Sequence, residues 1–192
     1  MSLGRITRFA LAATIATIGL AGAQLAPASA ATTQAEKPLA VRTVLYNANA
    51  AGVWKDNVTA AVAIWNASEK NVKLAAGSPA TMTIDAIDGW PYAEPSGLGR
   101  GRIHLGEQAV RDGFDRTRIT AHEIGHILGL PDNRTGLCSD LMSGHSAPTS
   151  CLNAHPSPKE AATVDRNFAN GFAAAATKVT RYDECFTERA CV

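Results

Sequence analysis

The sequence predicts one α+β domain preceded by a short leader. The chain has 192 residues, and about 150 of them remain after the leader, enough for one compact core. Short runs of β type gather between a first and a second helical pattern, and a third helical pattern follows. Strands grouped between helices in this way are typical of an α+β fold.

The first 30 residues have the pattern of a secretory signal peptide. Arg5 and Arg8 precede an uncharged, largely apolar stretch at 9–25, and Ala-Ser-Ala at 28–30 offers the small residues that a signal peptidase recognises. A membrane anchor is the alternative, but the apolar run is short, rich in Ala, Gly and Thr, and followed by this cleavage site. We therefore expect a secreted, extracellular protein in which 31–41 is a short pro-segment or a frayed terminus.

The first half of the domain predicts one helix among several strands. Residues 42–46 alternate toward a strand, and Asp56 is placed to cap a helix with an apolar stripe at i, i+3, i+4 and i+7. The stripe consists of Val58, Ala61, Val62 and Trp65. Strand-like runs follow at 72–75, 82–87 and 102–105, and a Pro/Gly-rich loop at 89–101 precedes the last of them.

A metal-binding pattern occupies the second predicted helix, at 117–128, and the turn after it. His122 and His126 stand four residues apart, so they project from one helix face and can share a zinc ion. Glu123 sits one step round the helix, where it suits a general base acting on a zinc-activated water molecule. Gly129 ends the helix and turns the chain back, which brings Asp132 to the place of a third ligand. Three such ligands leave one coordination position open for chemistry.

Other interpretations of this pattern are less favoured. A buried helix with two incidental histidines is the plainest one, because His-Glu-x-x-His also occurs by chance, but Gly129 and Asp132 at fixed offsets argue against it. A purely structural zinc site would usually have four protein ligands rich in Cys. His145 and His155 are alternative third ligands, and the spacing favours Asp132.

The third predicted helix begins at a capping box. Ser157 and Glu160 bracket it, with Pro158 at the first helical position, and Ala161, Val164 and Phe168 form an apolar stripe that ends at Gly171. We expect this helix to pack beneath the site. Residues 172–192 form a C-terminal extension without a motif, apart from the pair Cys185 and Cys191.

Charge and cysteine content narrow the function classes. Without Arg5 and Arg8, 16 basic residues face 17 acidic ones, so neither a nucleic-acid nor an anionic-membrane partner is indicated. Four cysteines in an exported chain predict two disulfides, for which three pairings are possible. Zinc binding by these thiols is disfavoured, because no short Cys-x-x-Cys spacing is present.

The extended zinc motif resembles that of metzincin-like peptidases, with Asp132 in place of the usual third histidine. From 42 to about 171 the chain resembles the snapalysin family, the small neutral zinc endopeptidases that Streptomyces secretes. The stretches that carry the resemblance are Ala-Ala-Val-Ala-Ile-Trp-Asn-Ala-Ser at 60–68, Gly-Arg-Gly-Arg-Ile at 99–103, Asp-Arg-Thr-Arg-Ile-Thr-Ala-His-Glu at 115–123, Cys-Ser-Asp-Leu-Met-Ser-Gly at 138–144 and Asp-Arg-Asn-Phe-Ala-Asn-Gly at 165–171.

The resemblance implies a zincin fold: a small twisted mixed sheet, an active-site helix, a Met-turn at Met142 and a C-terminal helix. It also implies zinc on His122, His126 and Asp132, with Glu123 catalytic. It pairs Cys138 with Cys151, leaving Cys185 and Cys191 for a second disulfide.

Two further implications carry alternatives. The resemblance implies a calcium ion near Asp115 and Thr117, although the same residues are suited to cap the helix. The chain also departs from the family pattern at one place, since Asn133 and Arg134 follow Asp132 where the family has His-Tyr. That tyrosine helps to stabilise the transition state in the family, so Arg134 is a cationic candidate for the role, or else a solvated loop residue.

The sequence as a whole predicts a secreted, monomeric zinc metalloendopeptidase acting on peptide or protein substrates, with the family's preference for an aromatic residue after the cleaved bond. Zincins bind peptides in extended form along an edge strand, for which 102–105 is the candidate, with His104 as a surface residue on it. A secreted binding module without activity, or a zinc hydrolase of non-peptide amides, are the alternatives.

Overall fold

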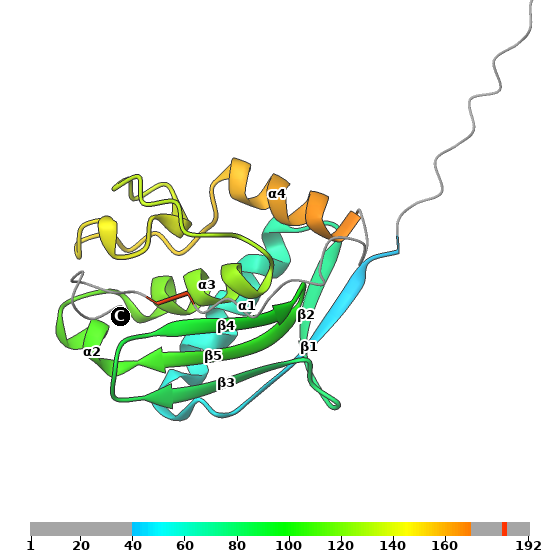
Figure 1. Cartoon of the computed structure of the whole chain (residues 1–192), viewed down its shortest axis with the longest axis horizontal. Helices are drawn as coiled ribbons and strands as arrows, with labels where there is room; N and C mark the ends of the chain where they lie inside the picture. Colours follow the sequence, from blue (N-terminus) through cyan, green and yellow to red (C-terminus); the bar gives the residue numbers. More distant parts are fainter. Residues whose placement is uncertain (1–39, 170–181, 184–192) are drawn as a thin grey trace, which may run out of the picture. The chain divides into compact units, whose positions relative to one another are not determined.

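The computed structural model describes residues 40–169 and 182–183. The expected signal peptide, most of the expected pro-segment at 31–41 and the pair Cys185 and Cys191 lie outside these residues. The elements are β1 (Arg42–Ala50), η1 (Gly52–Trp54), α1 (Lys55–Ser68), β2 (Val72–Ala76), β3 (Met82–Ile87), β4 (Tyr92–Gly97), β5 (Arg100–Gly106), α2 (Glu107–Arg111), α3 (Arg116–Ile127), η2 (Leu141–Ser146), α4 (Pro158–Ala169) and β6 (Tyr182–Asp183) (Figure 1). The predicted α+β class is confirmed.

The strands form one mixed sheet in the order β2-β1-β3-β5-β4-β6. The pairs β1–β2, β1–β3 and β3–β5 are parallel. The pairs β4–β5 and β4–β6 are antiparallel. A mixed sheet of this kind fits the twisted sheet that the family resemblance implied.

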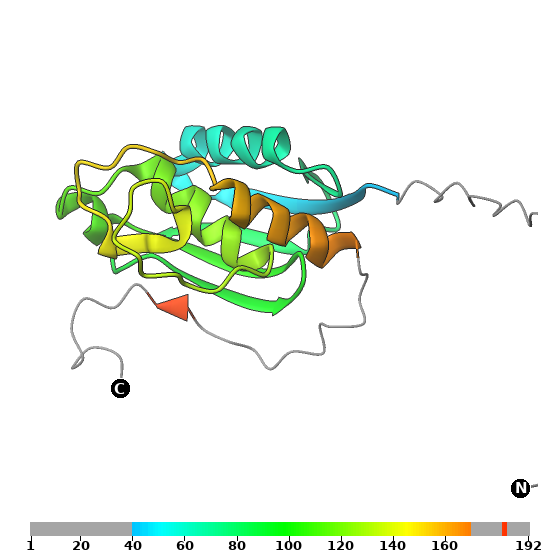
Figure 2. The ribbon, with the colours of Figure 1, turned by 90° about the horizontal axis from the view of Figure 1, so that it is seen from above.

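Both long central helices cover the same face of the sheet. α1 packs against β2, α3 packs against β4 and β5, and the two helices pack against each other (Figures 1 and 2). The strands direct alternate side chains into this layer, as the period of a half-buried strand requires, and the buried ones include Met82, Ile84, Ile103 and Leu105. The apolar stripe predicted on α1 is buried in full. The core therefore lies between the sheet and the two helices.

Three expectations from the sequence are wrong in detail. α1 begins at Lys55 with Trp54 as its N-cap residue, so Asp56 lies in the first helical turn, where its charge still suits the helix dipole. The stretch expected to be a loop contains β4, which forms a hairpin with β5. Because β5 therefore lies between β3 and β4, residues 102–105 are not an edge strand.

The last helix, α4, begins as the capping box predicts. The Ser157 hydroxyl accepts from the backbone N–H of Glu160 at 3.4 Å, and the Glu160 carboxylate accepts from the N–H of Ser157 at 2.6 Å. Val164 and Phe168 are buried, and Ala161 is half-buried. Within the part of the chain that the structure describes, no helix is long and apolar enough to cross a membrane.

Candidate active site

The helix α3 carries the predicted metal ligands in a buried position. His122 and His126 lie on one face of it, and almost all of its residues from Arg118 onward are buried. The indole Nε1–H of Trp65 on α1 donates to the carbonyl of Ala121 at 2.9 Å, which fixes the helix just before His122. The site is therefore built on a buried helix that is hydrogen-bonded to α1.

Three ligand atoms converge at the end of this helix. The Nε2 atoms of His122 and His126 lie 3.1 Å apart, and Oδ1 of Asp132 lies 3.4 Å and 3.6 Å from them. A tetrahedral zinc ion with bonds of about 2.0–2.1 Å holds its ligand atoms roughly 3.3 Å apart. The spacing of the three atoms thus fits a tetrahedral metal ion of this size, and these are the residues that the sequence predicts.

The tautomers of the two histidines also fit a metal ion. Nδ1 of His122 lies 3.0 Å from the carbonyl oxygen of Leu141, and Nδ1 of His126 lies 2.8 Å from that of Leu130. Because a carbonyl oxygen only accepts, each Nδ1 carries the proton and each Nε2 presents a lone pair. Two lone pairs directed at each other across 3.1 Å repel unless a cation lies between them.

The chain reversal after α3 brings Asp132 to this point. Gly129 has a φ of +89° and its N–H donates to the carbonyl of His126, while the N–H of Leu130 donates to that of Gly125, both at 3.0 Å. These two bonds form a Schellman motif, which ends the helix and turns the chain back. The role predicted for Gly129 is confirmed.

Glu123 lies beside the ligands and is fully buried. Its side chain lines a pocket whose walls are mainly apolar. The lining residues are Trp90, Pro91, Ala109, Phe114, Asp115, Arg118, Ile119, His122, Glu123, Gly144 and His145. Trp90 and Phe114 meet edge to face, with ring centroids 6.3 Å apart. The Glu123 carboxylate therefore lies next to the three candidate ligand side chains and to an apolar pocket of the kind that binds small ligands.

The short helix α2, which the sequence did not predict, closes one end of this pocket. The Arg116 guanidinium donates to both carboxylate oxygens of Glu107, at 2.6 Å and 2.7 Å, and these bonds hold the pKa of Glu107 below its usual range. Arg116 also lies 4.7 Å above the ring of Trp54. The ion pair joins α2, which contributes Ala109 to the pocket wall, to the first turn of α3, the helix that carries His122 and His126.

The turn η2 lies beneath the site, with Met142 buried in it. A Cβ atom on Gly125 would come within 2.7 Å of the Met142 sulfur, so the methionine packs directly against α3 between the two histidine positions. Gly144 kinks the turn with a φ of +53°. Met142 is therefore an apolar base for the site, in the place where the resemblance implied a Met-turn.

Comparison with known proteins agrees with this geometry. The family model described as the Streptomyces extracellular neutral proteinase (M7) family matches residues 40–171. The chain belongs to this family. It is 42% identical over 131 residues to the extracellular small neutral protease of Streptomyces caespitosus, which covers 67% of this chain and 98% of that protein.

A second relative in the family is longer than this chain. The extracellular small neutral protease of Streptomyces sp. strain C5 is 43% identical over 145 residues, 74% of this chain, and the chain matches only 63% of its length. Among solved structures, the medaka zinc-protease high choriolytic enzyme 1 shares 17% identity at a TM-score of 0.36, covering 50% of this chain and 47% of that one.

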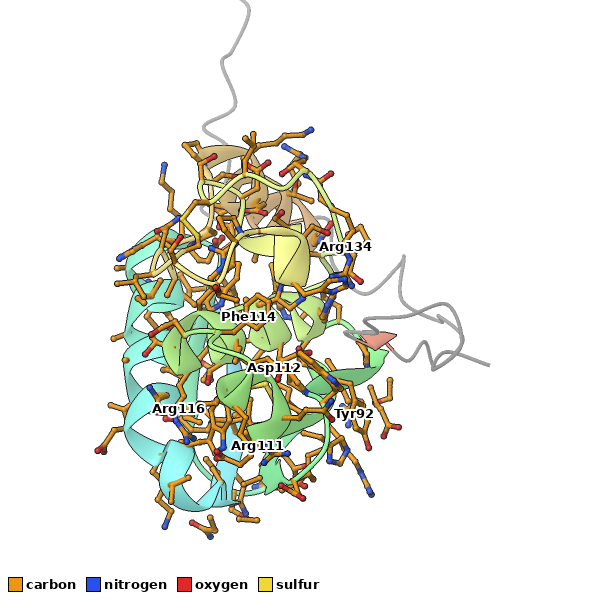
Figure 3. All side chains as sticks on the ribbon, turned by 90° about the vertical axis from the view of Figure 1, so that its left-hand side faces the viewer. Tyr92, Arg111, Asp112, Phe114, Arg116 and Arg134 are labelled. Atoms are coloured by element: carbon orange, nitrogen blue, oxygen red, sulfur yellow. A yellow bond between two sulfur atoms is a disulfide. The ribbon has the colours of Figure 1, made fainter. Side chains whose placement is uncertain are left out.

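Arg134 contacts one of the three candidate ligand side chains, that of Asp132. Its Nη2 donates to Oδ2 of Asp132 at 3.0 Å, and its Nη1 contacts Nδ1 of His145. Figure 3 shows Arg134 on the same side of the molecule as Phe114 of the pocket. Arg134 is thus an exposed loop residue that contacts both Asp132 and His145, and His145 lies outside the cluster of His122, His126 and Asp132.

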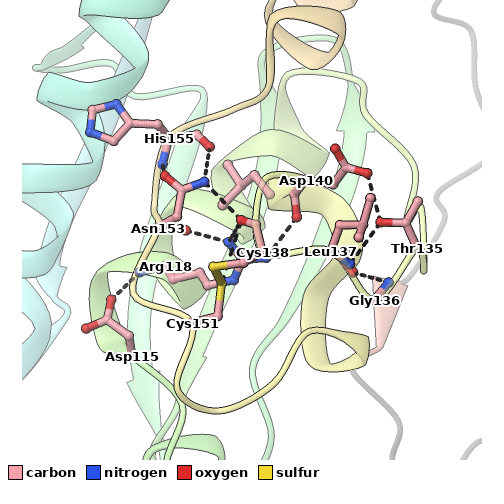
Figure 4. The surroundings of a disulfide bond; sticks show 12 residues. Asp115, Arg118, Thr135, Gly136, Leu137, Cys138, Asp140, Cys151, Asn153 and His155 are labelled. Carbon is pink, nitrogen blue, oxygen red and sulfur yellow. Dashed lines mark hydrogen bonds between the residues drawn. A yellow bond between two sulfur atoms is a disulfide. The ribbon is translucent and has the colours of Figure 1, made fainter.

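The disulfide that the resemblance implied is present. Cys138 and Cys151 are bonded, and they close the loop that contains η2 (Figure 4). The buried guanidinium of Arg118 on α3 donates to the carbonyls of Cys138 and Asp140 in this loop and to that of Asn153 just after it (Figure 4). No local pattern predicts this role for Arg118, because each acceptor is a backbone carbonyl distant in the chain.

Asp115 and Thr117 are engaged locally. Asp115 is the N-cap residue of α3, and its side chain accepts from the N–H of Arg118 at 2.8 Å. The Thr117 hydroxyl accepts from the side-chain amide of Asn57 at 2.9 Å. The capping interpretation is confirmed for Asp115, while the calcium ion stays a prediction.

His104 lies away from the pocket, on the sheet face opposite Ile103 and Leu105. Its Nδ1 is 3.0 Å from Oδ2 of Asp85, and its ring stacks on Tyr92 with centroids 4.4 Å apart. His155 lies outside the cluster of His122, His126 and Asp132. Neither histidine belongs to the candidate site.

Proposed function

We propose that the protein is a secreted zinc metalloendopeptidase that cleaves peptide bonds in extracellular proteins. The observation that carries the proposal is the convergence of two Nε2 lone pairs and one carboxylate oxygen beside a buried carboxylate, Glu123. Membership of a family of extracellular neutral proteinases supports it independently. His122, His126 and Asp132 would hold the zinc ion.

Zinc, when bound, would supply Lewis-acid chemistry that lowers the pKa of a water molecule far enough for it to lose a proton near neutral pH. The chain supplies the proton transfers. Glu123 accepts the proton of the attacking water and passes it to the leaving amine, which requires a carboxylate within hydrogen-bond reach of both. Its full burial and its place on a rigid helix restrict the carboxylate to this position.

The pocket supports a preference for an aromatic residue immediately after the cleaved bond. Trp90, Pro91 and Phe114 give it apolar walls, and Ile119 adds an aliphatic surface. A flat apolar side chain buries its surface there without leaving a polar group unpaired.

The proposal extends to the parts of the chain around the domain. Residues 1–30 are removed on export and 31–41 form a pro-segment, so the enzyme comprises 42–171 with the extension 172–192. It acts as a monomer. A calcium ion near Asp115 and Thr117 would supplement the helix cap, and a second disulfide would join Cys185 and Cys191.

Casein hydrolysis by the wild type and by Glu123→Gln, with zinc content measured on the same samples, tests the proposal. Glutamine keeps the size of glutamate but accepts no proton, so we expect zinc to remain bound while activity falls by about 10²–10⁴-fold. Hydrolysis of peptidoglycan but not casein would instead identify a non-peptide amide hydrolase. Bound zinc without any hydrolysis by the wild type would indicate a binding module.

A further inference from the structure

The guanidinium of Arg134 lies between two segments of the site. One nitrogen donates to Oδ2 of Asp132 at 3.0 Å, and the other contacts Nδ1 of His145 in η2. The backbone N–H of Asn133 also donates to the carbonyl of Met142 at 2.8 Å. The loop after α3 is thus joined to η2 through its backbone and through Arg134.

The two oxygens of Asp132 are divided between different neighbours. Oδ1 faces the Nε2 atoms of His122 and His126, at 3.4 Å and 3.6 Å, whereas Oδ2 faces Arg134. A planar guanidinium with a second fixed contact resists rotation, so it holds the carboxylate in one orientation. The Asp132 side chain is about a quarter exposed, and burial alone does not restrict it.

We propose that Arg134 is a positioning residue that orients Asp132 as a single-oxygen metal ligand, with His145 as the second point of attachment of the guanidinium. The inference rests on the proposed zinc site. It gives Arg134 a role through its contacts with Asp132 and His145, and it requires no contact between Arg134 and substrate.

The charge of Arg134 and its orienting effect on Asp132 predict opposite changes in zinc affinity when Arg134 is removed. A cation close to a zinc ion repels it, so the charge by itself weakens zinc binding, and its removal would tighten binding. Groups that orient a metal ligand strengthen binding, and their loss typically costs about 10–100-fold in metal affinity. Weaker zinc binding after the removal of Arg134 would therefore indicate orientation of Asp132, and tighter binding would indicate the effect of charge.

The test measures the zinc dissociation constant of the apoprotein by competition with a chelator of known affinity. We expect Arg134→Met to weaken zinc binding by about 10-fold or more. Arg134→Lys should recover only part of the loss, because an ammonium group does not bridge two acceptors in a fixed plane. Arg111→Met is the matched control, since Arg111 also pairs with an aspartate, Asp88, at 2.7 Å but lies on exposed α2. It should leave zinc affinity unchanged.

Unchanged or tighter zinc binding by Arg134→Met, with thermal unfolding of the apoprotein like that of the wild type, would overturn the proposal. His145→Ala provides a second measurement, for which we expect a smaller loss of affinity than for Arg134→Met. Because zinc affinity is measured without substrate, a wild type that binds zinc but cleaves nothing would contradict the proposed function and leave this inference intact.

A separate observation concerns the edge of the sheet. β6 pairs antiparallel with β4, with Tyr92 opposite Asp183 and Ala93 opposite Tyr182. β4 would otherwise end the sheet, because its other neighbour is β5 (Figure 2). Trp90 and Pro91, immediately before β4, line the pocket that also contains His122 and Glu123. β6 therefore occupies the strand edge next to the candidate site.

β6 lies beyond the part of the chain that matches the family, which ends at residue 171. Extended peptides bind proteins by adding a strand to a free sheet edge. We infer that β6 competes with an extended peptide substrate for the edge of β4. This also rests on the proposed function, whose substrate would need that edge.

Proline at both positions of β6 tests the inference in the full chain, because it removes the N–H groups that pair with β4. We expect Tyr182→Pro/Asp183→Pro to lower KM by about threefold or more, since a tethered competitor acts at a high effective concentration, and to leave kcat unchanged. Tyr182→Ala/Asp183→Ala keeps the N–H groups and is the matched control. Equal KM values for the proline variant and the wild type would overturn the inference.

A binding experiment distinguishes a failure of the β6 inference from a failure of the proposed function. A fluorescent peptide with the sequence of residues 178–187 should bind the proline variant more tightly than the wild type, whether or not either protein cleaves casein. Equal binding of the peptide to both proteins would also count against competition at β4.

Discussion

The Glu160 carboxylate accepts a 2.8 Å hydrogen bond from the backbone N–H of Met142, which ties the first turn of α4 to the turn beneath the candidate site. The same carboxylate accepts from the N–H of Leu141 at 3.1 Å and from that of Ser157. Glu160 is 7% exposed, so these donors replace most of its hydration. One side chain thus caps a helix and holds the Met-turn.

Replacing Glu160 should therefore destabilise the fold. Glu160→Gln keeps the shape but turns charge-assisted bonds into neutral ones and places an amide N–H₂ against backbone donors, so we expect a loss of about 1–3 kcal/mol in the free energy of unfolding. Urea unfolding measures it. Asp88→Asn is the control, because the Asp88 side chain is 91% exposed and its loss should stay within about 0.5 kcal/mol. Equal effects of the two variants would contradict this role.

A second prediction concerns the dependence of stability on pH. Burial, with the neighbouring Asp165 carboxylate second, raises the pKa of Glu69 to about 8, against the opposing charge of Lys73. Asp165 is itself held by the N–H groups of Lys70 and Asn71. In the unfolded chain Glu69 titrates near 4.5, so between this pH and about 8 the folded state retains a proton that the unfolded state has lost.

Stability should therefore be highest, with respect to this group, below pH 4.5 and should decline as the pH rises through about 8. Glu69→Gln removes the titration. We expect it to raise stability at pH 8.5 relative to the wild type by a few kcal/mol at most, and to have little effect near pH 4. Thermal unfolding across this range measures the difference; parallel curves for both proteins would show that Glu69 does not titrate in this way.

A third prediction follows from the contact between Gly125 and Met142. A methyl group at Gly125 would lie 2.7 Å from the Met142 sulfur and 3.3 Å from the Trp65 ring. Alanine gains about 1 kcal/mol over glycine in a helix, whereas overpacking a core costs about 1–3 kcal/mol. We expect a net loss of stability for Gly125→Ala. Adding Met142→Ala, which removes the clash, should make the double variant more stable than the sum of the two single effects. Strict additivity would exclude the clash.

A feature of the fold or the site could be predicted from the sequence when it depends on residues close together in the chain, and not when it depends on distant ones. The helix α3 and its end at Gly129 were predicted, and the cap at Asp115 was one of the interpretations left open, because each depends on residues within one or two turns. β4 was missed, since Pro91, Pro95 and Gly97 give its sequence the composition of a loop and its pairing with β5 forms across a hairpin. The contact between Arg134 and His145, and the bonds from Arg118 to three distant backbone carbonyls, join segments whose approach no local pattern encodes.

The last prediction compares two supports of the loop that contains η2. The Cys138–Cys151 disulfide closes 13 residues of sequence separation, and removing such a bridge costs about 2–4 kcal/mol, mainly through the entropy of the unfolded chain. Arg118→Met would remove this donor from the carbonyls of Cys138, Asp140 and Asn153, of which those of Cys138 and Asp140 keep a second donor. It would also remove hydrogen bonds to a charged group, each of which contributes about 1.5–3 kcal/mol. We therefore expect Arg118→Met to destabilise the fold more than Cys138→Ala/Cys151→Ala. Only the arginine variant should also weaken zinc binding, because the native loop is disturbed. Guanidinium unfolding and chelator competition measure both quantities, and the reverse ranking would place the disulfide, rather than Arg118, as the main support of the turn.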